Sequence, residues 1–273
     1  MKILSWNVWG LGNDRTFIAL KKFLNLYRPQ LIFLCETKLS TVCMNNVGKK
    51  LKMEIFFAVS SKGKSEGLAM LWNSETNVNI SSFSSHHIDA EIVAENGDQM
   101  RCIGIYGHPK ANQKKHTWTL LRRLAGLSSS PWLCFGDFNE IMHLNEKNGG
   151  NDREPSMIID FREAVEDCHL KDMGYNGYPF TWSNRRSIIY FIEERLDRFL
   201  CNKEWSDLFQ DQAATNLVTW CSDHNPILIV VKSKDGEGHY KRKCFSRTHY
   251  EDFWSSYDEC REIIEENWAK HGK

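Results

Sequence analysis

The sequence lacks the cysteine spacing of a zinc site or of a disulfide framework. Its nine cysteines are scattered singly over 273 residues, without a Cys-x-x-Cys pair, and their number is odd. This pattern predicts an intracellular, reducing compartment, in which the thiols pack as small hydrophobic groups.

Long apolar runs and a surplus of charge of one sign are missing as well. No run approaches the roughly 20 apolar residues of a membrane helix, and the strand-like start at residues 2–8 has no signal-peptide core, so we expect no membrane association. Thirty-five basic and thirty-five acidic residues cancel. A polyanionic partner would therefore have to be held by a local patch or by a metal ion.

Hydrophobic periodicity predicts one α/β domain over residues 1–231. Apolar runs bounded by Gly, Pro or Asn predict strands at 2–8, 31–36, 55–59, 68–72, 78–83, 88–92, 100–106, 131–135, 180–184, 190–192, 196–200, 217–220 and 227–231. Helical spacing predicts helices between Asn13 and Pro29, at 41–53, around 118–127, from Pro155 to Cys168, and at 205–209. The polar stretch 232–248 predicts a linker, and residues 249–273 predict an appended helix.

Polar side chains recur at the ends of these predicted strands. They are Asn7, Glu36, Tyr106, Asp137, Asn139, Asp197, Asp223 and His224. Carboxylates suit a hard cation such as Mg²⁺, and a histidine beside carboxylates can be held in one tautomer as an acid or base. Taken singly, residues 136–139 would be a turn more often than a site, and Asp197 would be a salt-bridge partner of a neighbouring arginine. The combination favours a site for hydrolysing an anionic substrate.

Several of these residues lie in motifs that follow one another along the chain. In order, the motifs are Trp6-Asn7, Glu36-Thr37, Tyr106-Gly107-His108-Pro109, Gly136-Asp137-Phe138-Asn139, Arg195-Leu196-Asp197 and Ser222-Asp223-His224-Asn225-Pro226. This order resembles the endonuclease/exonuclease/phosphatase superfamily, and residues 136–150 most resemble the endonuclease domain of plant non-LTR retrotransposons. The resemblance implies a DNase I-like α/β fold. In this four-layer α-β-β-α sandwich, two mainly antiparallel mixed sheets pack face to face, with helices outside and the active site at the rim.

The resemblance also implies an activity, a Mg²⁺-dependent phosphodiesterase that nicks DNA, with Mn²⁺ as an alternative metal. Its implied roles are metal binding by Glu36, Asn7 and Asp223, catalysis by Asp137, Asn139, His224, Asp197 and Tyr106, and DNA contact by Thr181, Trp182 and Asn184. Among the catalytic residues, Asp197 would orient His224 and Asp137 would position the attacking water.

Two positions depart from the pattern of the family. Trp9 stands where abasic-site endonucleases often carry Asp or Asn, and Asn225 replaces the small residue usual before Pro226. Two alternatives therefore stay open: an exonuclease or phosphatase acting on another phosphoester, and an inactive retrotransposon-derived relic.

Residues from 241 onward resemble the segment that leads to a reverse transcriptase. The expected partners are thus DNA and a reverse transcriptase segment of a longer parent protein, in a nuclear location. The histidines at 86, 87, 108 and 116 match no ligand spacing, so we expect them to be structural or solvated.

Overall fold

The computed structural model describes residues 1–53, 55–61, 66–93, 97, 99–210 and 212–234. Most of the predicted linker and the predicted helix at 249–273 lie outside these residues. The domain boundary near residue 231 accordingly remains a prediction. No helix of the described residues is long and apolar enough to cross a bilayer.

The larger of the two main sheets has seven strands and mixed directions. Its order is β11 (Tyr175–Gly177), β15 (Ala214–Asn216), β16 (Ile227–Val230), β1 (Lys2–Asn7), β2 (Leu31–Cys35), β4 (Leu68–Trp72) and β3 (Ile55–Val59). Strands β1 and β2 run parallel, and so do β11 and β15, while the other neighbours are antiparallel.

The second sheet has six strands. Its order is β10 (Lys171–Asp172), β14 (Asp197–Cys201), β8 (Trp132–Asp137), β7 (Gln99–Tyr106), β6 (His87–Val93) and β5 (Asn77–Ser84). Only β7 and β8 are parallel, since every other pair in this sheet is antiparallel.

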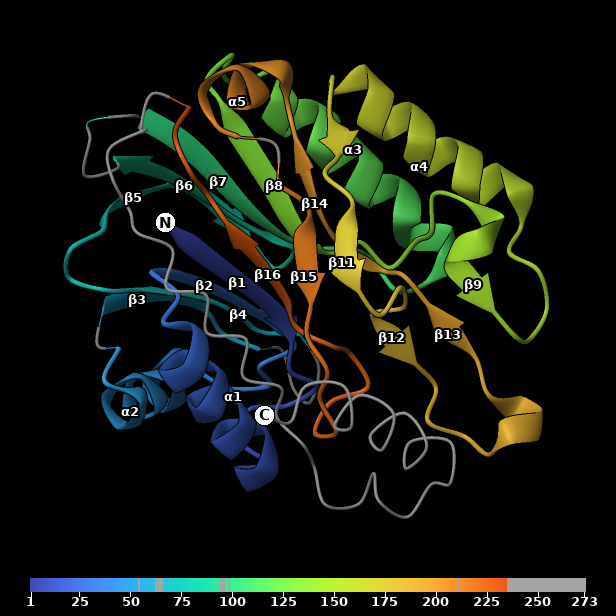
Figure 1. Cartoon of the computed structure of the whole chain (residues 1–273), viewed down its shortest axis with the longest axis horizontal. Helices are drawn as coiled ribbons and strands as arrows, with labels where there is room; N and C mark the ends of the chain where they lie inside the picture. The colour runs from blue at the N-terminus through green and yellow to red at the C-terminus, as the bar shows by residue number, and fades with distance from the viewer. Residues whose placement is uncertain (54, 62–65, 94–96, 98, 211, 235–273) are drawn as a thin grey trace, which may run out of the picture. The chain divides into compact units, whose positions relative to one another are not determined.

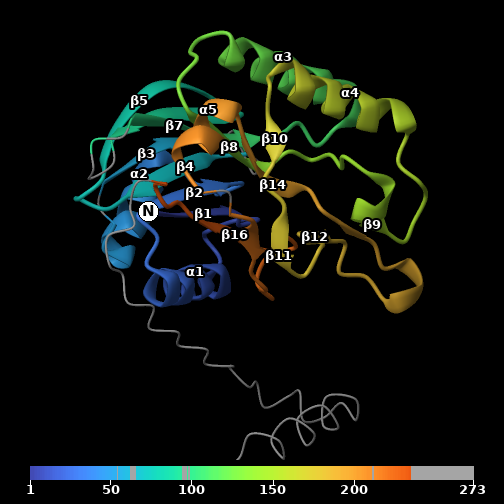
Figure 2. The same cartoon turned by 45° about the horizontal axis from the view of Figure 1, so that its top comes forward.

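Helices cover the outer faces of both sheets (Figures 1 and 2). The helices are α1 (Asp14–Tyr27), α2 (Thr41–Leu51), α3 (Lys114–Ala125), α4 (Pro155–Asp167) and α5 (Lys203–Leu208), with 3-10 turns η1 (Ala111–Gln113), η2 (Leu144–Glu146) and η3 (Ile188–Tyr190). Helices α1 and α2 lie on the seven-stranded sheet, and α3 and α4 lie on the six-stranded sheet. The predicted four-layer sandwich is confirmed.

Three apolar layers hold the sandwich together. Phe33 and Phe135 meet edge to face, with ring centroids 6.0 Å apart, in the core between the sheets. Trp6 packs in the layer under α1, and Trp118 stacks on Phe161 in the layer under α3 and α4. Burial of aromatic side chains on both faces explains why the central strands read as continuous apolar runs.

Local sequence sets the helix ends. The side chain of Asn13 accepts a hydrogen bond from the backbone of Arg15 and caps α1, and Ser40 caps α2 in the same way. Helix α1 ends before Arg28, which takes a left-handed conformation, and Pro29 follows it.

Three predicted strands were wrong in whole or in part. The predicted strand at 190–192 is replaced by η3, because the side chain of Asn184 bonds the backbone of Tyr190 and Ile192 and closes a loop. The predicted strand at 217–220 lies earlier, as β15, and the one at 180–184 shrinks to β12 (Trp182–Ser183).

A small third sheet was not predicted. It consists of β12, β13 (Glu193–Glu194) and β9 (Lys147–Asn148), all antiparallel. Its strands pair through charged residues, such as Lys147 with Glu194 at 2.5 Å, so no apolar alternation marks them.

Candidate active site

Strand ends from both main sheets meet at one rim. Asn7 ends β1, Tyr106 ends β7 and Asp137 ends β8, while Asp197 begins β14. The register pairs Asp137 with Tyr106 on one side and with Asp197 on the other. Glu36 directly follows β2, whose last residue pairs with Asn7. Two parallel strand pairs, one in each sheet, thus bring their carboxyl ends together.

Asn7 links the two sheets at this rim. Its amide nitrogen donates to Glu36 Oε1 at 3.0 Å and to Asp137 Oδ2 at 2.9 Å. The Tyr106 hydroxyl donates to the same Glu36 oxygen at 3.1 Å. Burial of Tyr106, together with the nearby Glu36 carboxylate, raises its pKa, so the phenol stays protonated. A buried amide and a buried phenol therefore hold one oxygen of Glu36.

His224 and Asp197 form a buried pair. The distance from His224 Nδ1 to Asp197 Oδ2 is 2.8 Å, and His224 Nε2 lies 3.6 Å from Asp137 Oδ2. Burial alone would lower the pKa of His224, but Asp197 and Asp137 outweigh it and raise this pKa to about 10. The imidazole is therefore a cation at neutral pH, with both ring nitrogens facing carboxylates.

Asp137 has an elevated pKa. Its complete burial raises the pKa to about 7, although the positive charge of His224 and the amide of Asn7 act in the opposite direction. Asn139 donates from its backbone to Asp137 Oδ1 at 2.8 Å and from its side chain to Oδ2 at 3.2 Å. A carboxyl group with a pKa near neutrality can both hold and release a proton at physiological pH.

Asn139 is held in a left-handed conformation, with φ of 55°. Its side-chain nitrogen also donates to Gly107 O at 2.9 Å, and its own carbonyl accepts from buried Lys114 Nζ at 2.5 Å. Lys114 is paired in turn with Glu140 at 2.6 Å. In this state the amide of Asn139 is directed at protein groups and fixes the turn after β8.

Asp223 lies beside this network without a hydrogen bond to Glu36 or Asn7 in the described part of the chain. Its Oδ2 accepts from the indole nitrogen of Trp182 at 3.1 Å. The neighbouring Ser222 hydroxyl donates to the backbone oxygen of Asn7 at 2.8 Å and ties the loop to β1. Of the three predicted metal-binding side chains, Asn7 and Glu36 are thus in contact, and Asp223 lies on the adjacent loop.

The predicted DNA-contact residues are placed in three different ways. Thr181 is fully buried, and its hydroxyl accepts from the backbone of Leu196 at 3.0 Å and of Asp197 at 2.9 Å. Its burial leaves no surface for a substrate, which does not fit the predicted contact. Trp182 bonds Asp223, and Asn184 closes the base of a loop at 185–191.

Two further side chains lie at the rim: Lys38, which the sequence interpretation missed, and Trp9, which it noted as a departure from the family pattern. Lys38 Nζ lies 3.6 Å from Glu36 Oε2 and 5.1 Å from the ring centroid of Trp9. Trp9 is 56 % exposed, and its backbone nitrogen donates to Asn7 Oδ1 at 3.2 Å. The only sequence signal for Lys38 was its position two residues after Glu36.

The donor atoms at the rim suit a hard divalent cation. Glu36 is partly exposed, and among the described residues its Oε2 has only the long contact to Lys38, so this oxygen is available to an ion. A second group, Asp137, Asp197 and His224, offers ligand atoms within 4.8 Å of one another. In the second group, however, Nδ1 of His224 is already committed to Asp197. Glu36 with the Asn7 amide oxygen is the better fit for Mg²⁺.

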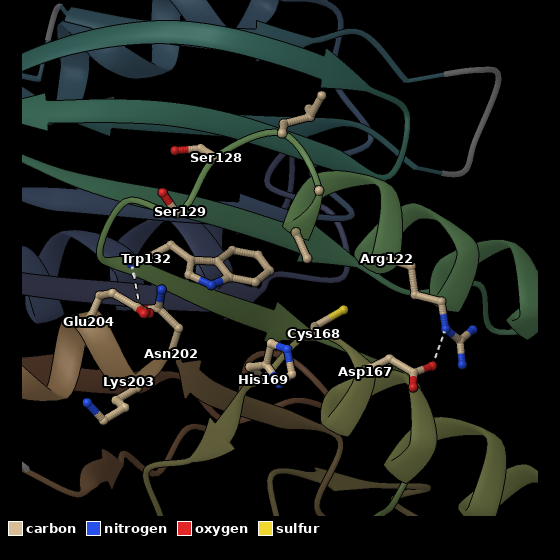
Figure 3. A pocket seen from close by; sticks show the side chains of 13 residues that line it. Arg122, Ser128, Ser129, Trp132, Asp167, Cys168, His169, Asn202, Lys203 and Glu204 are labelled. Atoms are coloured by element: carbon tan, nitrogen blue, oxygen red, sulfur yellow. Dashed lines mark hydrogen bonds and ion pairs between the residues drawn. The ribbon is translucent and has the colours of Figure 1, made fainter.

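A cavity lies at the opposite end of β8. It measures about 1050 Å³ and is lined by the ends of α3 and α4 and the start of α5, including Trp132, Cys168 and Asn202 (Figure 3). Trp132 is the first residue of β8, whereas Asp137 is the last. None of the predicted site residues lines this cavity.

Comparisons with known proteins agree with the geometry. The sequence pattern of the Endonuclease/Exonuclease/phosphatase family matches residues 4–224. No curated protein sequence matches the chain.

The chain is similar to solved structures of this fold. A 3′-5′ exonuclease from Neisseria meningitidis superposes with a TM-score of 0.64 at 16% identity, covering 85% of this chain and 99% of that one. The endonuclease domain of TRAS1, a telomere-specific non-LTR retrotransposon, gives 0.63 at 11% identity, with coverages of 85% and 98%. An AP endonuclease from Archaeoglobus fulgidus gives 0.61 at 17% identity, with coverages of 85% and 99%. The resemblance stated from the motifs is confirmed, and so is the DNase I-like fold.

Proposed function

Because this chain belongs to the Endonuclease/Exonuclease/phosphatase family, we propose that it is a Mg²⁺-dependent phosphodiesterase that nicks one strand of DNA. The family makes it a phosphoester hydrolase. The choice of DNA, of an internal cut and of Mg²⁺ is our proposal. One observation carries it: a buried His-Asp pair, a carboxyl group with a pKa of about 7 and a partly exposed Glu36 all lie at one rim.

Asp137 would act as the general base. Its pKa of about 7 lies near the working pH, which is where a general base transfers protons most effectively. In an in-line displacement, a water oxygen bonds to phosphorus while the bond to the 3′ oxygen breaks. The leaving 3′ oxygen takes a proton from solvent, which leaves 5′-phosphate and 3′-hydroxyl ends. Asp137 would take the proton of that water.

His224 would supply positive charge. It is a cation at neutral pH, and Asp197 fixes its ring through Nδ1, so Nε2 is oriented toward Asp137 and the reacting phosphate. Tyr106 would donate to a phosphoryl oxygen in place of Glu36 Oε1. Asn139 would hold Asp137 in position through the two hydrogen bonds it gives that carboxylate.

Glu36 and Asn7 would hold the metal ion, and Asp223 would contribute from the adjacent loop. A bound Mg²⁺ supplies Lewis-acid stabilisation of the charge that develops on the phosphoryl and leaving oxygens. We propose that Thr181 positions Asp197 by accepting a hydrogen bond from its backbone nitrogen, and that Thr181 does not contact the substrate.

The loop at 185–191 favours a large substrate such as duplex DNA. It projects from the body of the protein together with β12 and β13 (Figure 1). Ile189 is 87 % exposed and Tyr190 is 67 % exposed. Arg185, at its base, donates to the carbonyls of Thr219, Trp220 and Ser222, so the loop is anchored to the segment that carries His224. Apolar side chains that protrude in this way can enter a DNA groove.

The test is nicking of supercoiled plasmid by the purified chain, with Mg²⁺ or with EDTA. We expect conversion to open circles that requires the metal and is lost in the Asp137→Asn and His224→Ala proteins. The matched control is Asp160→Asn, which changes an exposed residue on the outer helix α4 and should leave nicking intact. If the Asp137→Asn and His224→Ala proteins convert the plasmid to open circles as well as the wild type does, the proposal is overturned.

A labelled linear duplex distinguishes endonuclease activity from exonuclease activity, the nearest alternative. The 3′-5′ exonuclease with a similar fold makes stepwise removal of terminal nucleotides the rival activity. Internal fragments from a 5′-labelled strand would support the endonuclease, whereas a ladder that shortens by single nucleotides would support the exonuclease. No reaction with either substrate would favour the inactive relic. The nuclear location and the reverse transcriptase segment also remain proposals.

A further inference from the structure

Three of the histidines that were expected to be structural or solvated form a column of rings at Tyr106. The rings of His86 and Tyr106 are parallel within 4°, with centroids 5.8 Å apart. His108 also lies against His86, at 3.7 Å between centroids, and His116 meets His108 edge-on at 5.7 Å. The column therefore begins at a buried side chain of the active site and ends at the exposed His116 of α3.

His86 also binds the backbone of Tyr106 on both sides of the residue. Tyr106 N donates to His86 O at 2.9 Å, and the distance from His86 Nδ1 to Tyr106 O is 2.8 Å. A carbonyl oxygen can only accept, so Nδ1 must carry the proton in this contact. The backbone of His86 is fixed in turn, because its N–H donates to the Ser84 hydroxyl at 3.0 Å.

His108 packs against His86 and is itself held in place. Its backbone N–H donates to Thr117 Oγ1 at 2.9 Å, which ties the loop after β7 to α3. Burial, together with the neighbouring imidazoles of His86 and His116, lowers the pKa of His108 to about 4. At neutral pH the ring of His108 is therefore uncharged and packs against His86 without repulsion.

We propose that His86 is a positioning residue for Tyr106, holding its phenol at the Glu36 edge of the active site. The proposal rests on the catalytic role proposed above for Tyr106. Tyr106 has its hydroxyl bond to Glu36 at one end and its backbone bonds to His86 at the other. Removing the His86 ring takes away one hydrogen bond and the parallel ring contact, and the phenol is then free to tilt. A displacement of this kind lowers the rate of the chemical step more than it weakens binding.

A double-mutant cycle with Tyr106→Phe tests the proposal. We expect His86→Ala to lower kcat about tenfold, which is what loss of one hydrogen bond can cause, with KM changed less than about twofold. In the Tyr106→Phe background the same change should cost less than about twofold, because the hydroxyl that His86 positions is already absent. Equal losses in both backgrounds would overturn the proposal.

Matched variants separate positioning from folding. His116→Ala removes a histidine of the same column that does not touch Tyr106, and it should leave kcat unchanged. His86→Asn keeps a donor for Tyr106 O and should recover part of the rate, whereas His86→Phe keeps only the ring. Thermal unfolding of each variant identifies any that is misfolded. If His86→Ala is misfolded, the double-mutant cycle with Tyr106→Phe is measured with His86→Asn or His86→Phe instead. A loss in His116→Ala equal to that in His86→Ala would contradict the inference.

The substrates distinguish this inference from the proposed function. Bis(4-nitrophenyl) phosphate is a simple phosphodiester, so the cycle can be measured on it even if plasmid DNA is not nicked. If neither is hydrolysed, ¹⁹F spectra of protein labelled with 3-fluorotyrosine give an independent readout, with the Tyr106 signal assigned by its absence in Tyr106→Phe. That signal should move in His86→Ala and stay in place in His116→Ala. A signal that does not respond to His86→Ala would refute the positioning role.

Discussion

Replacement of Thr181 by valine separates a structural role from contact with the substrate. The Thr181 hydroxyl is buried and accepts from the backbone nitrogens of Leu196 and Asp197, at 3.0 and 2.9 Å. Valine has nearly the same shape but no acceptor, so Thr181→Val leaves both buried N–H groups without this partner. Each unsatisfied group costs about 1–3 kcal/mol. Allowing for partial relaxation, we expect the free energy of unfolding to fall by about 2–4 kcal/mol.

Thr181→Ser is the matched control. It keeps the acceptor and removes one methyl group, which costs about 1 kcal/mol of buried apolar surface. Urea unfolding followed by tryptophan fluorescence measures both variants, and an unchanged m-value would show that the difference lies in stability and not in the unfolded state. For a domain of this size, each kcal/mol lowers Tm by roughly 2–4 °C.

The comparison of the two variants decides the role of this residue. If Thr181→Val is as stable as Thr181→Ser, the two hydrogen bonds contribute nothing, and the reasoning from burial is refuted. If Thr181→Val keeps full stability and only raises KM for DNA, the contact with the substrate predicted from the sequence is restored.

Three further predictions concern the ion pairs of Arg198 with Glu146 and Asp172, and the glycine of the motif at residues 136–139. Arg198 is completely buried and binds Glu146 at 2.9 Å, so Arg198→Met should lower stability by about 3 kcal/mol in urea unfolding. Burial alone would raise the pKa values of Glu146 and Asp172, but Arg198, together with Arg195 and backbone hydrogen bonds, outweighs it and lowers both. The stability difference between the wild type and Arg198→Met, measured against pH, should therefore be level above about pH 5 and shrink as pH falls below the ordinary carboxyl pKa of about 4; a difference that shrinks only at alkaline pH would contradict this sign. Gly136→Ala should give no soluble folded protein, because its Cβ would lie 2.1 Å from Ile105 O at φ of +134°. Normal expression with an unchanged Tm would show instead that the backbone can shift at this position.

The central strands could be predicted because burial on both faces makes them continuous apolar runs. Strand β4, buried along its whole length, has the predicted bounds, 68–72. The edge strand β3, which is only partly buried, also has its predicted bounds, 55–59. The small third sheet could not be predicted, since β13 consists of two glutamates whose strand conformation depends on partners distant in sequence. A strand was wrongly predicted at 190–192, at the end of loop 185–191, because apolar residues predominate there. In the structure Tyr190 and Phe191 are exposed.

At the candidate site, the sequence predicted where polar residues would gather and missed how they are held. Strand ends at one rim follow from the periodicity, so Asn7, Glu36 and Asp137 could be expected to meet. The need for glycine at position 136 comes from the adjacent strand, because a Cβ there would lie 2.1 Å from the backbone oxygen of Ile105. The contacts of His86 depend on the turn between β5 and β6, and no local pattern indicates which strand end that turn will reach.

Convergence of the site follows from the direction of only a few strands. Strands β1 and β2 are parallel in one sheet and β7 and β8 are parallel in the other, so a single packing of the two sheets brings four carboxyl ends to one rim. Strand β14 is antiparallel to β8, and its first residue, Asp197, therefore lies beside the last residue of β8, Asp137. The amide of Asn7 then spans the sheets by donating to Asp137. A shift of one residue in the register of β8 would turn the Asp137 side chain to the opposite face of its sheet. The same contacts that hold the sandwich together thus fix the distance between the proposed metal ligands and the proposed base.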